Sequence, residues 1–473
     1  MDPDAYRAHD ALGLAALVRT GEVTPHEVLD AALAALEAAN PSVNAVVGVF
    51  EGDARRAIDA GLPDGPLRGV PWALKDLWTR VAGVATSNGS RLFAGDVAAR
   101  DSEIVRRYRA AGLVLFAKTN TPELGLNAST EGVLFGPARN PWDRSRSTGG
   151  SSGGAAAAVA AGIVPMAHAT DGGGSIRIPA SCCGLFGLKP TRGRVTQGPE
   201  RGEGWNGMSA QHVVSRSVRD SAAALDVTAG PMAGDPYWAP PAPPSYLADM
   251  RADPPILRVG LCVDAPSGVA VDPTCTAAAE ASARRCEALG HRVETVAWPF
   301  AGLDAATAQA TIISAHLVAT VDARLAALGR PLAEEDIEPL TAAMYERGRS
   351  IAGVQYVGAV AAMHRIGREM GELFERIDVL LTPMLGRPPL PIGTLDTRDP
   401  ARFGREIGGV TPFAGVANLT GQPAMTVPLD EVDGVPVGSQ FIGRFGDEST
   451  LFRLAAQLER AHPWAGRRPP API

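Results

Sequence analysis

Apolar residues along this chain recur with two periods, which predict amphipathic helices alternating with short buried strands. Residues 5–40 carry the 3.6-residue repeat of two helices. The second helix is expected to begin at a capping box, Thr24-Pro25-His26-Glu27, with proline at the first helical position. Asn40-Pro41 is expected to end it, because the residue before a proline avoids the helical conformation.

Further along, uninterrupted apolar runs predict buried strands, and longer periodic stretches predict helices. The strands are expected over residues 43–50, 70–74, 113–117, 258–263, 292–296 and 378–383, with 415–428 and 435–441 completing the core. The helices are expected over residues 102–111, 155–161, 274–289, 305–328, 334–376 and 449–460. The proline-rich segment 231–255 is expected to be a loop. This alternation is typical of an α/β fold with a mostly parallel or mixed sheet.

Composition and charge narrow the class of protein. The 473 residues are 45% hydrophobic and 20% charged, as in a soluble globular protein that buries a sizeable core. A net charge of −7 argues against a surface built for nucleic acid. The sequence has neither the pattern of a secretory leader nor an apolar run of about 20 residues, so no membrane span is expected.

The five cysteines are an odd number and lack the paired spacing of a zinc site. Cys182 and Cys183 are adjacent, so a disulfide between them would be strained. Free thiols in a reducing compartment are the better interpretation, and a cytoplasmic location is therefore expected.

Two glycine-rich segments carry the candidate chemistry. Ser151 lies within Gly149–Gly154, and Ser175 follows Gly172–Gly174. Glycines let several backbone N–H groups converge beside a hydroxyl, an arrangement suited to the oxyanion of a tetrahedral intermediate. A serine nucleophile needs a base, and Lys75 ends an apolar strand whose surroundings would favour its neutral form.

Two different interpretations of these segments explain less. A flexible Gly/Ser linker is disfavoured because an apolar helix-forming run follows at once. Residues 149–153 also match Gly-x-Ser-x-Gly, the nucleophile elbow of α/β-hydrolases, which requires a later acid and a histidine. His316, His364 and His462 are available, but this interpretation leaves Ser175 and Lys75 without a role. Neither a metal-binding motif nor a phosphate-binding loop is present.

These motifs together resemble the amidase signature family. The resemblance rests on residues 70–76, 118–123, 149–154 and 171–193, and it covers most of the chain, most weakly between about 230 and 400. It implies a central mixed, twisted β-sheet covered by helices on both faces. It also implies a single domain, 1–473, with its core at about 43–230 and 378–460 and a more variable helical pocket region at about 231–377.

The resemblance also implies roles for individual residues. Ser175 would be the nucleophile, Ser151 the bridging serine after a cis peptide bond, and Lys75 the terminal base. The oxyanion hole would be formed by the N–H groups of Gly172, Gly173, Gly174 and Ser175, with Gly172 replacing a bulkier Thr, Ile or Ala of the family pattern. The supporting residues would be Gly150, Ser152, Asp171 and Arg177. Neither a cofactor nor a metal is implied.

Three short segments, residues 139–142, 165–168 and 463–469, resemble the nylon oligomer (6-aminohexanoate-cyclic-dimer) hydrolase branch. The expected substrate is an uncharged, fairly hydrophobic amide, aliphatic or aryl, with carbamates and an esterase side activity as the alternative. A glutaminase-type amidotransferase subunit and a non-catalytic binding protein are less favoured. The pocket is expected to include Leu126, Phe135, Ile313 and His316. The expected partner is the small-molecule substrate, and a homodimer is compatible with the sequence.

Overall fold

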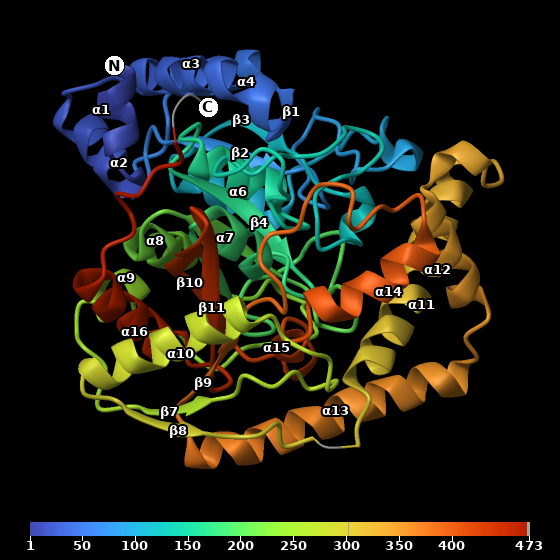
Figure 1. Ribbon diagram of the computed structural model, residues 1–473. Helices are drawn as coiled ribbons and strands as arrows, with labels where there is room; N and C mark the ends of the chain where they lie inside the picture. The colour runs from blue at the N-terminus through green and yellow to red at the C-terminus, as the bar shows by residue number, and fades with distance from the viewer. Residues whose placement is uncertain (301, 471–473) are drawn as a thin grey trace.

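An eleven-stranded sheet lies at the centre of the structure, a computed structural model in which residues 1–300 and 302–470 are described (Figure 1). Its strand order is β1-β3-β2-β4-β6-β5-β10-β11-β9-β7-β8. The strands are β1 (Val46–Val49), β2 (Pro71–Lys75), β3 (Val114–Thr119), β4 (Met166–Asp171), β5 (Phe186–Lys189), β6 (Ala210–Ser215), β7 (Arg258–Leu261), β8 (Arg292–Thr295), β9 (Val379–Pro383), β10 (Ala424–Val432) and β11 (Val435–Gly443).

The described helices surround this sheet. The first eight α-helices are α1 (Pro3–Ala8), α2 (Ala11–Thr20), α3 (Pro25–Val43), α4 (Glu51–Asp59), α5 (Glu103–Ala110), α6 (Gly153–Ala160), α7 (Arg177–Cys183) and α8 (Val218–Thr228). The others are α9 (Tyr246–Asp249), α10 (Pro273–Ala288), α11 (Ala305–Leu328), α12 (Pro339–Arg349), α13 (Gly353–Arg376), α14 (Pro400–Val410), α15 (Val416–Thr420) and α16 (Glu448–Ala461). Short 3₁₀ helices are η1 (Arg91–Phe93), η2 (Glu123–Gly125) and η3 (Glu334–Asp336).

The sheet is mixed, as expected. β2 pairs in parallel with β3 and β4, and β7 pairs in parallel with β8 and β9. Between these two parallel groups, β4, β6, β5, β10, β11 and β9 pair antiparallel in that order. Strands β10 and β11 thus join the two halves of the sheet, although they are the last strands in the sequence and follow β5 by more than 200 residues.

Helices cover both faces of the sheet. A Cβ added at Gly187 of β5 would lie 2.7 Å from Ala180 Cβ of α7, whereas the ring of the preceding residue, Phe186, packs against Phe452 of α16. Neighbouring residues of a strand point to opposite faces, so α7 and α16 lie on opposite sides. Helix α6 lies beside α7, and every residue of α6 is buried. Its small side chains therefore allow the close packing that the alanine-rich sequence predicts.

The capping box at Thr24 is present, but the expected helix end at Asn40-Pro41 is wrong. Helix α3 continues to Val43 and stops at Asn44, which adopts the left-handed conformation and donates its N–H to Asn40 O. A proline in the last turn removes only one backbone donor. The side chain of Asn40 also bonds both backbone groups of Val46, so β1 starts directly after the helix.

The single long helix expected over 334–376 is also wrong. This stretch forms η3, α12 and α13, and the break between α12 and α13 lies at Ser350 to Ala352. The segment 415–428 begins with α15 before it enters β10. The strands β4, β5 and β6 and the helices α4, α7, α8 and α14 were not expected, and the short helix α9 lies within residues 231–255, which were expected to be a loop. The other strands overlap the expected ranges.

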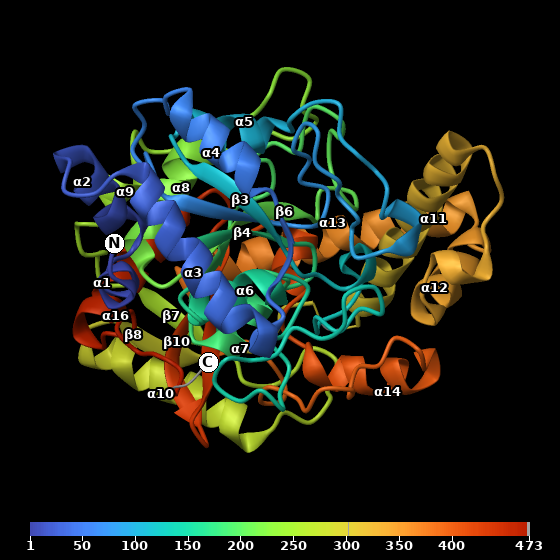
Figure 2. The same cartoon turned by 90° about the horizontal axis from the view of Figure 1, so that it is seen from above.

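Helices α11 and α12 lie at the side of the molecule opposite α1 and α2 in both views (Figures 1 and 2). By length and composition α11 could cross a membrane, with a mean hydropathy of 1.4, although no membrane span was expected from the sequence. In the structure it packs against α12 and α13. Its N-terminal part reaches the glycine loop that follows β4, because Gln309 donates to Gly172 O at 3.3 Å.

Candidate active site

Lys75 lies at the end of β2, and its side chain is fully buried. Its Nζ atom lies 2.7 Å from Ser151 Oγ and 2.9 Å from Thr170 Oγ1. Thr170 belongs to β4, the strand beside β2, so the sheet itself brings these two residues together. The amine is therefore held between two hydroxyls.

Burial determines the charge of this amine. Desolvation lowers the pKa of Lys75 well below its usual value, and the charge of Asp171 opposes this shift only in part. A neutral amine at this position can accept the proton of the Ser151 hydroxyl while it donates to Thr170.

The first glycine-rich segment, residues 149–154, is held by close packing and by hydrogen bonds to β4. The peptide bond between Gly150 and Ser151 is cis, as expected. A Cβ at Gly150 would lie 2.6 Å from Ser129 O, so only glycine fits there. Ser152 donates its hydroxyl to Thr170 O at 3.1 Å and accepts the N–H of Thr170 at 3.2 Å. The Ser152 hydroxyl thus ties the segment to β4, and in the described structure it makes no hydrogen bond to Ser151.

Asp171 organises the second glycine-rich segment from the end of β4. It accepts the N–H of Gly174 at 2.7 Å and the N–H of Ile176 at 3.1 Å. Its buried carboxylate also pairs with Arg177 at 2.9 Å. Burial alone would raise the pKa of Asp171, but the Arg177 guanidinium overcomes this effect and holds the pKa well below its usual range. Arg177 is in turn bonded to Asn418 Oδ1 at 2.6 Å, so this ion pair joins the loop to α15.

One of the four backbone N–H groups expected to form the oxyanion hole is already bonded within the protein. The N–H of Gly174 points to Asp171 and is already bonded. Across residues 1–300 and 302–470, no protein acceptor bonds to the N–H of Gly172, Gly173 or Ser175. These three groups are therefore the donors available to a bound carbonyl oxygen.

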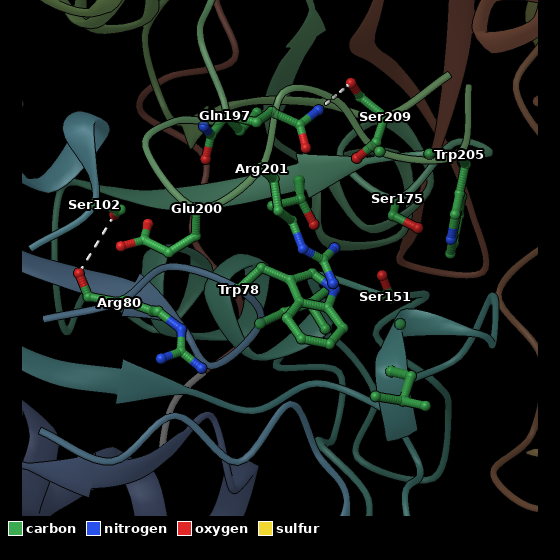
Figure 3. A pocket seen from close by; sticks show the side chains of 17 residues that line it. Trp78, Arg80, Ser102, Ser151, Ser175, Gln197, Glu200, Arg201, Trp205 and Ser209 are labelled. Carbon is green, nitrogen blue, oxygen red and sulfur yellow. Dashed lines mark hydrogen bonds between the residues drawn. The ribbon is translucent and has the colours of Figure 1, made fainter. Parts of the chain in front are cut away.

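Ser151 and Ser175 line one pocket together with Thr170 and Gly172. Figure 3 shows the two hydroxyls near each other below a loop that carries Arg201. Within the described residues the two hydroxyls make no direct hydrogen bond with each other. Catalytic hydrogen bonds often become short only when the substrate is in place.

The lining of this pocket differs from the apolar one expected. Apolar side chains are present at Leu77, Trp78, Leu124 and Trp205, but polar and charged ones also line it. The polar lining residues are Arg80, Ser102, Ser151, Thr170, Ser175, Gln197, Glu200, Arg201, Ser209 and Gln211. Many of these belong to residues 196–209, a loop between β5 and β6 that carries no recognisable motif.

Of the four residues expected to bind substrate, the structure places two beside the pocket of the serines. Leu126 and His316 line an adjoining pocket, which shares Trp78, Arg201 and Trp205 with the first. Phe135 and Ile313 line neither of these two pockets. Phe135 offers only its backbone oxygen to Asn44, and Ile313 packs among the apolar residues of α11 and α13. Helical phase and loop direction decide such contacts, and neither can be read from a single sequence.

Trp205 and Arg201, which line the pocket, and Gln309, which lies beside it, are among the residues that the sequence did not single out. Trp205 lies against Gly172, where an added Cβ would be 2.4 Å from the indole Cζ3 atom. Arg201 has its guanidinium carbon 3.7 Å from the centre of the Trp78 ring. Gln309 reaches the backbone of Gly172 from α11. Only Gly172, which replaces a bulkier residue of the family pattern, hinted at any of them.

The nucleophile-elbow interpretation finds no support in these contacts. The imidazole of His316 bonds the hydroxyl of Tyr356 at 3.1 Å. Within the part of the chain that the structure describes, Ser151 and Ser175 have no histidine as a hydrogen-bond partner. Lys75 occupies the position that a histidine would require.

Comparison with known proteins agrees with the sequence motifs. The family model named Amidase matches residues 27–452. The 6-aminohexanoate-cyclic-dimer hydrolase of Paenarthrobacter ureafaciens is 40% identical, over 97% of this chain and 96% of that protein. A solved structure of 6-aminohexanoate cyclic dimer hydrolase complexed with substrate superimposes with a TM-score of 0.92 at 38% identity, covering 98% of both chains. A bacterial aryl acylamidase of the amidase signature enzymes has a TM-score of 0.88 at 28% identity, covering 98% of this chain and 99% of the other.

Proposed function

The chain belongs to the amidase family and is an amidohydrolase, and we propose that it cleaves amides through Ser175, Ser151 and Lys75 by way of an acyl-enzyme. One observation carries this proposal. The buried Lys75 amine lies 2.7 Å from Ser151 Oγ, in the pocket that Ser175 also lines. This arrangement supplies a base, a proton-relaying hydroxyl and a second hydroxyl beside free backbone donors.

In the proposed reaction Ser175 Oγ attacks the amide carbonyl carbon. Its proton passes to Ser151, and the proton of Ser151 passes to the neutral amine of Lys75. The carbonyl oxygen becomes an oxyanion, which the N–H groups of Gly172, Gly173 and Ser175 stabilise. Preorganised donors act strongly because they need no reorientation as the charge develops.

The second half of the reaction reverses the proton relay. Lys75 returns a proton through Ser151 to the nitrogen of the leaving amine, and the C–N bond breaks. Water then attacks the acyl-enzyme ester with the same relay as base, and the acid product leaves Ser175 free. Among the protein's side chains, only Lys75, Ser151 and Ser175 exchange protons in these steps, with the leaving amine and the attacking water as the other partners.

The proposed substrate is a small amide that is uncharged around the scissile bond. Leu77, Trp78, Leu124 and Trp205 supply apolar surface close to the two serines. The relatives named for nylon oligomers and aryl amides support both aliphatic and aryl amides as substrates. Carbamates and esters suit the same acyl transfer. Each test amide is therefore to be assayed beside the corresponding carbamate and ester, and glutamine is to be assayed as the substrate of the glutaminase alternative.

Labelling with a sulfonyl fluoride, followed by peptide mass spectrometry, tests the nucleophile. We expect one adduct, on Ser175, because that hydroxyl is activated by the relay. In Ser175→Ala the adduct disappears and kcat falls by a factor on the order of 10⁴ or more, as for other removed nucleophiles, while the circular dichroism spectrum stays that of the wild type. An adduct on Ser151 instead, or full turnover by Ser175→Ala, would contradict the assignment.

A further inference from the structure

An arginine in the wall of the active-site pocket has no carboxylate partner among the residues that the structure describes. Arg201 lies between β5 and β6 and lines both the pocket of the two serines and the adjoining one. Figure 3 shows its guanidinium over the indole of Trp78, on the side facing Ser151. The charge is therefore presented to the space that a substrate would occupy.

The carboxylates of this region are engaged by other groups. Their pairings are Glu200 with Arg100 at 2.9 Å, Asp96 with Arg80 and with Arg324, and Glu203 with the N–H of Gly207. Glu203 acts on Arg201 only from a distance. Across residues 1–300 and 302–470 no acid forms an ion pair with Arg201.

The charge of Arg201 persists despite its partial burial. Desolvation, with repulsion from Arg80 as a second cause, lowers the pKa of Arg201 to about 10, so the side chain is a cation at neutral pH. A partly buried cation without a counter-ion is costly. The face of Trp78 offsets part of this cost through a cation–π contact at 3.7 Å.

Trp78 is itself a rigid support. Its backbone N–H donates to Asn88 Oδ1 at 2.8 Å, and its ring meets Phe93 edge-on at 5.6 Å. The loop of Arg201 is held by Gln197, which donates to Ser209 O at 2.7 Å. The guanidinium is thus fixed in the pocket before any ligand arrives, and fixed donors bind without a large loss of entropy.

We infer that Arg201 binds a carboxylate of the substrate, at an end remote from the scissile amide. The planar guanidinium offers two parallel N–H donors that match a carboxylate. The inference rests on the proposed function and names its substrate class. Monoamides of dicarboxylic acids and N-acyl amino acids, including linear oligomers of ω-amino acids, are preferred over fully neutral amides.

The test uses two pairs of amides that differ only in a terminal carboxylate. On the acyl side, glutaric acid mono-4-nitroanilide is compared with pentanoic acid 4-nitroanilide. On the amine side, N-hexanoyl-6-aminohexanoate is compared with N-hexanoyl-hexylamine. For the wild type, kcat/KM should favour the carboxylate of at least one pair by about 10- to 100-fold, mainly through KM, as for a charged hydrogen bond.

Substitutions assign this preference to the arginine. Arg201→Gln should reduce the preference to about onefold, because a neutral amide side chain attracts no carboxylate, and Arg201→Lys should keep an intermediate value. Arg106→Gln is the matched control, since it removes one positive charge at a side chain that is 68% exposed and lies outside the pocket. That variant should keep both the activity and the preference of the wild type.

The possible results are distinguishable. A wild-type preference near onefold in both pairs would overturn the inference while leaving the proposed function intact. A preference that survives in folded Arg201→Gln would overturn the role of Arg201, and Arg201→Lys decides the same point if the glutamine variant does not fold. Failure to cleave any of the four amides would overturn the proposed function together with the inference.

Discussion

An exposed lysine is protonated at neutral pH, whereas Lys75 is fully buried between the hydroxyls of Ser151 and Thr170. Desolvation penalises the ammonium form and so lowers its pKa. The negative charge of Asp171 favours the ammonium form of Lys75 and so raises its pKa. Because Asp171 is paired with Arg177, this effect is too weak to offset the desolvation. The chemistry of this residue is therefore set by its surroundings.

This environment predicts the pH dependence of activity. In the proposed mechanism the neutral amine is the active form, so kcat/KM should rise as pH rises through the lowered pKa and be lost as pH falls through it. Thr170→Val removes an acceptor that favours the ammonium, which lowers the pKa further, and the acidic limb should move to lower pH. A pH profile of both proteins measures this shift. A limb that stays in place in the variant would show that Lys75 is not the titrating base.

At the scale of elements, two loops meet over Ser151 and Ser175. The loop after β4 has glycine at 172, and the indole of Trp205, from the loop between β5 and β6, lies where a side chain would otherwise be. Gly174 must also be glycine, because it has a φ of +119° and a Cβ there would lie 2.7 Å from Ala414. The indole of Trp205 thus fills the space that a side chain at position 172 would occupy.

Gly172→Ala should therefore push the indole of Trp205 or displace the oxyanion donors. We expect kcat/KM to fall by about 10- to 100-fold, because small misplacement of donors is costly. Adding Trp205→Ala should restore part of the loss, and the coupling in a double-mutant cycle should be about 2- to 100-fold. Purely additive effects of the two substitutions would contradict the steric pairing.

At the scale of the whole molecule, the helical region of α11 and α12 is attached to the sheet through a buried acid. Glu123, in η2 beside the pocket, accepts the Ser90 hydroxyl at 2.6 Å and the N–H of Glu338 at 2.7 Å, just before α12. Burial raises the pKa of Glu123 to about 7. The folded protein therefore binds a proton at this site that the unfolded chain releases near its ordinary acidic pKa.

Linkage gives the sign of the resulting stability change. Between the unfolded and folded pKa values the folded state holds more protons, so this group's contribution to stability is lost as pH rises to about 7 and is constant above it. Glu123→Gln cannot titrate, so the unfolding free energy of the wild type relative to this variant should fall by about 3 kcal/mol over that range. Urea unfolding at several pH values measures this difference. The exposed Glu335→Gln is the control, and a difference independent of pH would contradict the expectation.

Much of the local structure follows from the pattern of residues alone. Apolar runs located most of the strands, the capping box located the start of α3, and the alanine-rich run located α6, because these depend on neighbours in sequence. The glycine-rich segments and Lys75 were likewise identified before their distances were known. The cis bond before Ser151 and the contact of Lys75 with Ser151 agree with the resemblance, whereas the catalytic roles stay a prediction.

What the pattern could not decide were the contacts between segments distant in sequence. The approach of Trp205 to Gly172 and of Arg201 to Trp78 depends on where those segments lie in the fold. Residues 196–209 carry no periodic pattern and no motif, so their place over the serines follows only from the pairing of β5 and β6 in the sheet. Local propensity acts over a few residues, whereas the shape and charge of the pocket arise from packing across the whole chain. For that reason the chemistry of the two serines could be inferred from the sequence, and the selectivity of the pocket only from the fold.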